Sequence, residues 1–174
     1  MAPTLQIIGK KKSGKTTTMI SFIEAAHKQE ALVAAFKHTH HTVSMDVKGT
    51  DTDCFAKAGA RQVGMQNDAG FFWHETRNLA IKVSLETEIA RYVAKETDLI
   101  LVEGFKWENY PKLLLVRPED QVADFKQYTH IQYIASLYPE KIGENILDFS
   151  TDEKRKIWFE KFYQEAKNGY LNTL

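Results

Sequence analysis

The segment GKKKSGKT at residues 9–16 constrains the fold of this chain more than any other feature, because it fits the pattern G-x-x-x-x-G-K-[ST]. In such a loop, Gly9 and Gly14 allow the backbone to curl so that successive N–H groups point inward at a phosphate. A helix beginning near Lys15 adds unpaired N–H groups and the positive end of its dipole. Lys15 can reach the β and γ phosphates, and the Thr16 hydroxyl can ligate Mg²⁺. The segment therefore predicts a nucleotide-binding loop.

The surrounding sequence has the order that such a loop requires. The apolar run at residues 5–8 predicts a strand before the loop, and residues 16–30 have apolar positions at helical spacing after it. Residues 31–36 predict a second buried strand, which completes a βαβ unit. Further strands are expected at 61–66, 98–102, 111–116 and 131–135, and further helices at 54–58, 85–95 and 152–167. This alternation predicts an α/β fold, a P-loop NTPase-like, mostly parallel sheet flanked by helices.

Two local patterns refine this expectation. The turn sequence NDAG at residues 67–70 predicts a β-hairpin extension over residues 63–77. Ser150 and Glu153 have the spacing of a capping box, which makes Ser150 the expected N-cap of the last helix. The apolar positions of that helix should pack on the sheet; they are Trp158, Phe162 and Ala166, flanked by Phe159 and Tyr163.

The hairpin also suggests how the chain assembles. Phe71, Phe72 and Trp73 are consecutive, so their rings lie on both faces of one strand. A two-stranded ribbon needs something to pack against, and we expect a partner subunit of a homodimer to supply it. Burial against helices of the same chain is the alternative.

Composition excludes several classes of protein. The 174 residues, 43% hydrophobic and 26% charged, are typical of one folded domain, so we expect a single nucleotide-binding domain over residues 1–174. Lys and Arg total 23, as do Asp and Glu, so no basic field predicts binding to nucleic acid or to a membrane surface. No run of about 20 apolar residues predicts a membrane span. With one cysteine, Cys54, and no export signal at the amino terminus, we expect a cytoplasmic protein.

Phosphate chemistry also needs an acidic group near the metal. Glu103 ends the most apolar strand, at the carboxyl edge where open α/β sheets bind their ligands. A further carboxylate from Asp46, Asp51 or Asp53 could reach Mg²⁺, and spacing alone does not choose among these three.

The histidines at positions 38, 40 and 41 resemble a metal cluster. A zinc site would need more Cys or His ligands, and Cys54 is the only thiol, so we do not expect zinc. Phosphate or substrate contacts, or ordinary loop positions, are the alternatives for these histidines.

Several motifs together resemble one protein family. They are GKKKSGKTT in the loop, KHTHH at residues 37–41, DTDCFAKAGA at 51–60, VEGFK at 102–106 and the Pro111-Lys112 pair. Their order over residues 5–117 is similar to that of the molybdopterin-guanine dinucleotide biosynthesis protein B (MobB) family. The resemblance implies a homodimeric GTP-binding fold and weak GTPase activity at best. It also implies an accessory role for the molybdenum cofactor guanylyltransferase, which joins GMP to molybdopterin, so that molybdopterin or its guanine dinucleotide is a further expected ligand.

The resemblance also assigns site residues. It implies that the phosphates of GTP are held by Gly9, Lys10, Lys11, Lys12, Ser13, Gly14, Lys15, Thr16 and Thr17. Lys37 and His38 would line the same pocket. Asp51 occupies the family's acidic position before Gly59, which selects it over the other two aspartates. Thr16, Asp51 and Glu103 would then serve Mg²⁺, with Asp51 and Glu103 as the catalytic carboxylates.

The residues alone do not determine which base is bound. The chain has no N-K-x-D element, so the preference for guanine rests on the resemblance, and we expect residues 135–139 to contact the base. Lys10 also gives the loop the form G-K-x-x-x-G-K-T, in which a lysine can cross a dimer interface, although coincidence is the simpler explanation for three consecutive lysines.

The sequence also allows more than one class of reaction at the nucleotide site. A small-molecule kinase would carry an arginine-bearing lid, and residues 104–150 contain only Arg117. We expect surface roles for all four arginines considered as fingers, which are Arg61, Arg77, Arg91 and Arg117. Slow GTP hydrolysis is therefore the expected activity, and a small-molecule kinase or a non-catalytic nucleotide-binding adaptor is the alternative.

Overall fold

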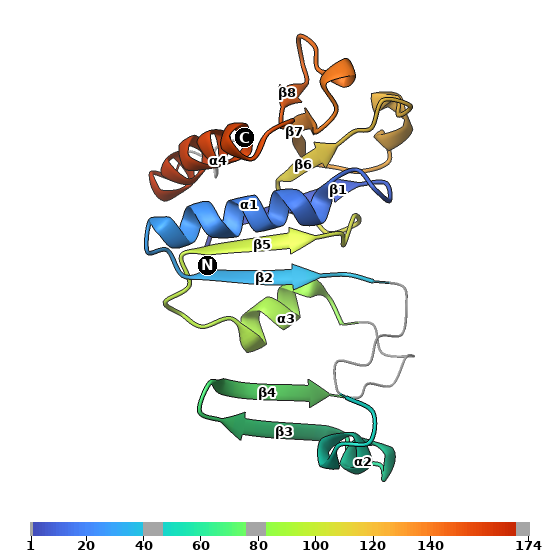
Figure 1. Ribbon diagram of the computed structural model, residues 1–174, viewed down its shortest axis with the longest axis vertical. Helices are drawn as coiled ribbons and strands as arrows, with labels where there is room; N and C mark the ends of the chain where they lie inside the picture. Colours follow the sequence, from blue (N-terminus) through green and yellow to red (C-terminus); the bar gives the residue numbers. More distant parts are fainter. Residues whose placement is uncertain (1, 40–46, 76–82, 170–174) are drawn as a thin grey trace. The chain divides into compact units, whose positions relative to one another are not determined.

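The computed structural model describes residues 2–39, 47–75 and 83–169 (Figure 1). The chain divides into two compact units. The larger unit comprises residues 1–38 and 85–174, and the smaller unit comprises residues 39–84.

The larger unit is built on a six-stranded sheet in the order β2-β5-β1-β6-β7-β8, and every pairing in it is parallel. The strands are β1 (Thr4–Gly9), β2 (Val33–Lys37), β5 (Leu99–Glu103), β6 (Lys112–Leu115), β7 (Ile131–Ser136) and β8 (Leu147–Asp148). β1, β5 and β6 are buried along their full length, which explains why most of their residues are apolar. The predicted α/β fold is confirmed.

Helices cover both faces of this sheet. They are α1 (Lys15–Lys28), α3 (Leu85–Tyr92) and α4 (Asp152–Lys167), with 3-10 turns η1 (Val122–Phe125) and η2 (Pro139–Lys141). Because side chains alternate along a strand, β5 separates the two layers. Leu99 and Leu101 pack in the cluster of α1 and α4, whereas Ile100 and Val102 pack with Leu85 of α3.

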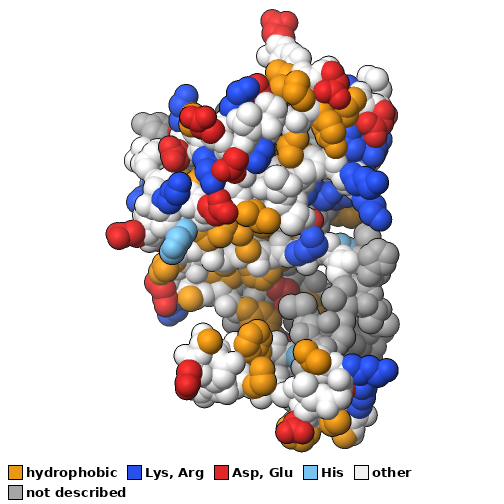
Figure 2. Space-filling view, in the orientation of Figure 1, with side chains coloured by type: hydrophobic (Ala, Val, Ile, Leu, Met, Phe, Trp, Pro, Cys, Tyr) orange, Lys and Arg blue, Asp and Glu red, His pale blue; other side chains and the backbone are white. Residues whose placement is uncertain are grey.

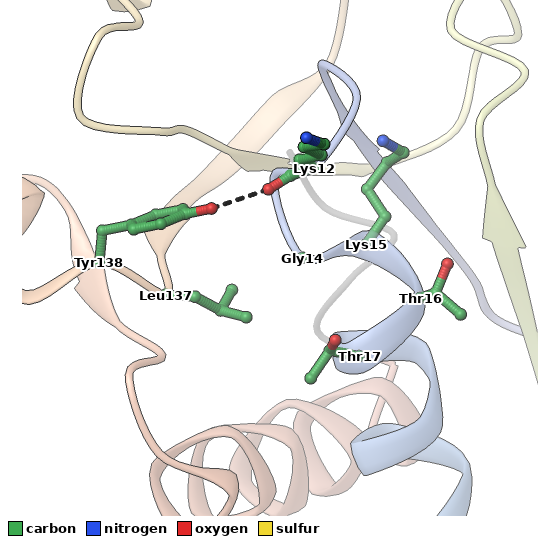
Figure 3. Close-up of a pocket in the computed structure, with 7 residues that line it drawn as sticks. All are labelled: Lys12, Gly14, Lys15, Thr16, Thr17, Leu137 and Tyr138. Atoms are coloured by element: carbon green, nitrogen blue, oxygen red, sulfur yellow. Dashed lines mark hydrogen bonds between the residues drawn. The ribbon is translucent and has the colours of Figure 1, made fainter.

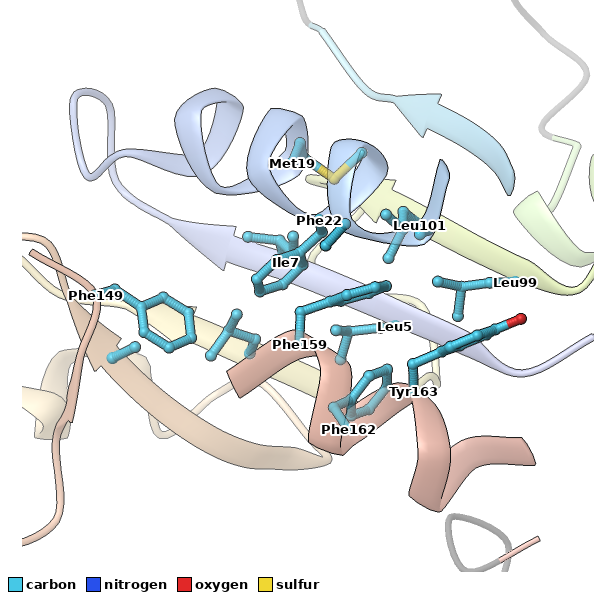
Figure 4. Close-up of a cluster of buried hydrophobic side chains, with 14 of the residues drawn as sticks. Leu5, Ile7, Met19, Phe22, Leu99, Leu101, Phe149, Phe159, Phe162 and Tyr163 are labelled. Atoms are coloured by element: carbon cyan, nitrogen blue, oxygen red, sulfur yellow. The ribbon is translucent and has the colours of Figure 1, made fainter. Parts of the chain in front are cut away.

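Aromatic rings fill the layer between α1, α4 and the sheet (Figure 4). Phe22 of α1 stacks on Phe159 of α4 with ring centroids 4.8 Å apart, and both are fully buried. Phe162 and Tyr163 extend the cluster. The prediction that the last helix packs on the sheet is therefore confirmed, although Trp158 is only partly buried.

The predicted cap of α4 is wrong by one residue. Thr151, rather than Ser150, is the N-cap, and its hydroxyl accepts a hydrogen bond from the backbone N–H of Lys154. The Ser150 hydroxyl instead donates to Asp148 at 2.6 Å. A competing carboxylate at the end of β8 thus occupies the side chain that the sequence pattern assigns to the helix.

The smaller unit contains α2 (Asp51–Lys57) and the antiparallel pair β3 (Gln62–Asn67) and β4 (Gly70–Glu75). The predicted hairpin is confirmed over residues 63–75, and Thr76 and Arg77 lie outside the described residues. The Asn67 side chain accepts hydrogen bonds from the backbone of Ala69 and Gly70, which closes the turn. Hydrophobic side chains are exposed on this unit (Figure 2). Phe71 of β4 is 62% exposed.

Candidate nucleotide-binding site

The loop between β1 and α1 requires both of its glycines. A Cβ on Gly9 would lie 2.4 Å from the Ser13 Oγ and 2.5 Å from the carbonyl oxygen of Leu115. Gly14 has φ +90°, and a Cβ there would lie 2.4 Å from Leu137 Cδ2. The glycines of the sequence motif are thus placed by close packing against β6 and the segment after β7, as well as by the turn itself.

Lys15 begins α1 and folds back over the loop. Its Nζ donates a hydrogen bond to the carbonyl oxygen of Lys10 at 2.8 Å. Burial lowers the pKa of the Lys15 ammonium; Glu103 opposes that shift, whereas the positive charges of Lys106 and Lys37 add to it. A bound phosphate would oppose this shift, because its negative charge favours the charged ammonium.

The loop also holds a polar atom that lacks a partner. The Ser13 hydroxyl is buried and makes no hydrogen bond within the described part of the chain. Buried polar groups in proteins nearly always have partners, so such an atom calls for an explanation. This hydroxyl lies on the side of the loop that faces Gly9, where a Cβ would come within 2.4 Å of it.

Thr16, Glu103 and Lys37 form one cluster, which we call the carboxylate corner. The Thr16 hydroxyl donates to Glu103 Oε2 at 3.0 Å, and Lys37 Nζ lies 2.9 Å from Glu103 Oε1. Lys37 Nζ is also 3.5 Å from the Thr16 oxygen. Strand order explains the cluster, because Lys37 and Glu103 are register partners at the carboxyl ends of β2 and β5.

The carboxylate corner fits Mg²⁺ in the way that nucleotide sites hold it. Mg²⁺ keeps several waters and takes one or two protein oxygens together with substrate phosphates. The Thr16 hydroxyl would be the protein ligand, and Glu103 would hold the water shell from the far side. The described residues contain no group of three His, Cys, Asp or Glu side chains that could bind a metal without a nucleotide.

The other predicted carboxylates belong to the smaller unit. Asp51 is the first residue of α2, so its role at the metal stays a prediction. Asp53 accepts a hydrogen bond from the backbone N–H of Gly49 at 2.8 Å and pairs with Lys57, which lowers its pKa. Asp46 lies outside the described residues.

His38 follows β2 and lies next to the strand that ends at Glu103. Its backbone N–H donates to the Glu103 carbonyl at 2.9 Å, and its ring centroid is 4.9 Å from that of Phe105. The structure therefore places His38 beside the site, whereas His40 and His41 lie outside the described residues.

A charged cluster behind the loop was missed from the sequence. Lys10 Nζ lies 3.0 Å from Asp120 Oδ1 and 3.0 Å from Asp124 Oδ2, both in its own chain. Arg117 donates to both oxygens of Asp120, at 3.1 Å from Nε and 2.9 Å from Nη2, and reaches the Lys11 carbonyl at 3.4 Å. We call these residues the Asp120 network. Arg117 has a structural role here in place of the expected surface role.

The cations of the Asp120 network strongly favour the ionised form of the Asp120 carboxyl. The Asp120 side chain is fully buried, and the Arg117 guanidinium beside it holds the pKa of that carboxyl well below its usual range, with further help from Lys10. The network therefore fixes the position of the loop's first lysines. No local motif marks it, because Arg117 and Asp120 are more than one hundred residues from Lys10 in sequence.

A cavity of about 370 Å³ opens beside the loop (Figure 3). It is lined by Lys12, Gly14, Lys15, Thr16, Thr17, Leu137 and Tyr138. The Tyr138 hydroxyl donates to the carbonyl oxygen of Lys12 at 2.9 Å. Two residues of the segment 135–139, which we expected to contact the base, thus line the cavity beside the loop; they are Leu137 and Tyr138. The base contact itself stays a prediction.

One further positioning residue could have been found from the sequence. Gln6 is the longest polar side chain of β1, and it is fully buried. Its Nε2 donates to the carbonyl oxygen of Gly104 at 2.6 Å and also to that of Phe105. It thereby fixes the backbone just beyond Glu103.

Within the described ranges, none of the helices combines the length and the apolar character that crossing a membrane requires.

Comparisons with known proteins agree on one relationship. Residues 4–137 match the family model described as MobB, molybdopterin guanine dinucleotide synthesis protein B. The chain is 34% identical over 150 residues, 85% of its own length and 82% of the relative's, to the molybdopterin-guanine dinucleotide biosynthesis adapter protein of Haemophilus influenzae. It is 30% identical over 159 residues, 88% and 89% of the two chains, to the Escherichia coli protein of the same name. The crystal structure of a MobB homolog from Bacillus stearothermophilus matches with a TM-score of 0.70 and 26% identity, over 92% of this chain and 97% of that one.

Proposed function

The chain belongs to the MobB family of molybdopterin guanine dinucleotide synthesis proteins, and from this premise we propose that it is a GTP-binding adapter in the synthesis of that dinucleotide. It binds GTP with Mg²⁺ at the loop of residues 9–16 and assists the guanylyltransferase that attaches GMP to molybdopterin. Its own hydrolysis of GTP is slow.

The observation that carries the proposal is the convergence of three groups at one edge of the sheet. Lys15 lies over the loop with its pKa lowered by burial. Thr16 lies in the first turn of α1, and its hydroxyl donates to Glu103 Oε2 at 3.0 Å. A triphosphate in the loop would receive the Lys15 charge and the inward N–H groups. Mg²⁺, when bound, neutralises charge on the β and γ phosphates.

Slow turnover follows from what lines the cavity. Among the described residues, those that line the cavity include no arginine, so charge that develops on the γ phosphate is only partly compensated. Arg117 is held by Asp120 and Glu119 behind the loop. The same arrangement disfavours the small-molecule kinase, which needs an arginine over the transferred phosphate. It leaves the non-catalytic adaptor as the alternative.

The expected partners are the guanylyltransferase, molybdopterin or its guanine dinucleotide, and a second copy of this chain. The exposed rings on β4 support the homodimer, since Phe71, Phe72 and Trp73 are each about half exposed or more, at 62%, 61% and 48%. Sedimentation at micromolar protein tests this; a monomeric mass would remove the dimer from the proposal.

Calorimetric titration with GTP and ATP, with and without Mg²⁺, tests the nucleotide site. We expect heat with GTP, and we expect Lys15→Met to weaken binding by about 10- to 100-fold, the value of one lost charge-assisted contact. Lys28→Met is the matched control, because Lys28 lies at the other end of α1, about 18 Å from the loop at 1.5 Å per residue. The proposal is wrong if the unaltered protein gives no heat with either nucleotide.

A further inference from the structure

The ammonium of Lys37 supplies positive charge to the carboxylate corner, as a bound metal ion would. It is 2.9 Å from Glu103 Oε1 and 3.5 Å from the Thr16 oxygen. These are the two groups that a nucleotide-bound Mg²⁺ would use, one as a ligand and one through its water shell.

Burial explains why the corner needs a cation. The Glu103 side chain is only 10% exposed, and burying a carboxylate without a partner is costly. Its Oε2 accepts the Thr16 hydroxyl, which carries no net charge, so the carboxylate is neutralised by Lys37, its ion-pair partner, with Lys15 adding positive charge nearby. The pairing also keeps the Thr16 hydroxyl and the carboxylate together.

Lys37 can leave this position easily. It is the last residue of β2, which is the edge strand of the sheet, and its side chain is 57% exposed. A long lysine side chain in contact with solvent can rotate to other positions at small cost. By contrast, Glu103 is held inside the sheet between β2 and β1.

We infer that Lys37 is a tethered cation that shares the Thr16–Glu103 corner with Mg²⁺ and thereby sets how strongly nucleotide binding depends on the metal. The inference rests on the proposed nucleotide site. Without metal, Lys37 shields the incoming phosphates from the charge of Glu103, so nucleotide still binds. When Mg²⁺ is bound, the Lys37 side chain moves away from Thr16 and Glu103, so it contributes little to the affinity for GTP.

The test compares the ratio of the dissociation constant for GTP without Mg²⁺ to that with Mg²⁺. In Lys37→Met, which keeps the length of the side chain but removes its charge, Glu103 repels metal-free nucleotide. We expect this variant to raise the ratio by about tenfold, nearly all of it from weaker metal-free binding. Lys37→Arg retains the charge and should stay near the ratio of the unaltered protein. Lys28→Met controls for the loss of one positive charge elsewhere.

The reciprocal variant Glu103→Gln makes the test independent of any effect of Lys37→Met on folding. It removes the charge that both cations neutralise, so the ratio should fall below that of the unaltered protein. Equal weakening of both dissociation constants in Lys37→Met would overturn the inference, because Lys37 would then be a simple phosphate contact. An unchanged ratio in both neutral variants would also overturn it. Absence of GTP binding in the unaltered protein would instead refute the nucleotide site itself.

Discussion

Replacing Asp120 with Asn tests whether the Asp120 network holds the nucleotide loop in place. The carboxylate is fully buried and accepts from Lys10, from two nitrogens of Arg117 and from the Arg117 backbone N–H at 2.9 Å. Asn has nearly the same shape but only one accepting oxygen, so its amide nitrogen must face a donor. Lys10 and Arg117 also lose their shared buried partner and keep only the more exposed Asp124 and Glu119.

The expected cost follows from burial and from the number of contacts. Breaking a buried ion pair typically costs about 3–5 kcal/mol, and the partial exposure of Lys10 and Arg117, 42% and 22%, places this case near the lower end. We therefore expect Asp120→Asn to lower the free energy of unfolding by about 3 kcal/mol, which corresponds to roughly 6–12 °C in Tm for a chain of this size.

The pH dependence gives this prediction its sign. Arg117 holds the native pKa of Asp120 below its ordinary value, so the carboxylate stabilises the fold above the unfolded pKa of about 3.9. That contribution is lost progressively as pH falls below about 4. The difference in the free energy of unfolding between the unaltered protein and Asp120→Asn should therefore become smaller at these pH values.

Urea unfolding followed by tryptophan fluorescence, at pH 7 and at a series of lower pH values, measures both effects. Asp124→Asn is the matched control, because Asp124 is 45% exposed and also forms an ion pair with Lys10. It should cost less than about 1 kcal/mol. The reasoning is refuted if the two variants are equally stable at pH 7, or if the cost of Asp120→Asn is unchanged at pH 2.

Two further substitutions test local geometry. Gly14→Ala places a Cβ 2.4 Å from Leu137 Cδ2 at φ +90°, so we expect a loss of about 1–3 kcal/mol in urea unfolding, part of which Leu137→Ala restores; full stability of the single variant would contradict the packing described. Thr151→Ala removes the hydroxyl that caps α4 and should cost about 1 kcal/mol in the same assay, and a neutral result would mean that Thr151 is not the cap.

Local patterns in the sequence predicted much of the framework correctly. The run 5–8, the loop and the following helix are consecutive, so their spacing alone predicts strand, turn and helix, and the structure has all three. The hairpin was equally accessible, since Asn67 and Gly70 form its turn without help from distant residues. Where two neighbouring residues compete for one local role, as Ser150 and Thr151 do, a contact from outside the pattern decided the outcome.

The sequence by itself determined which elements form and that a phosphate-binding turn joins β1 to α1, because backbone conformation and apolar periodicity are local properties. Only the tertiary structure decided that Lys37 faces Glu103, since this depends on β2 lying next to β5 in the sheet. The same holds for Lys10 and Asp120, and for Leu137 against Gly14, which are brought together by strand order across more than one hundred residues. Pairings of this kind leave no periodic trace in the chain, because the partners are adjacent in space only after the sheet has assembled.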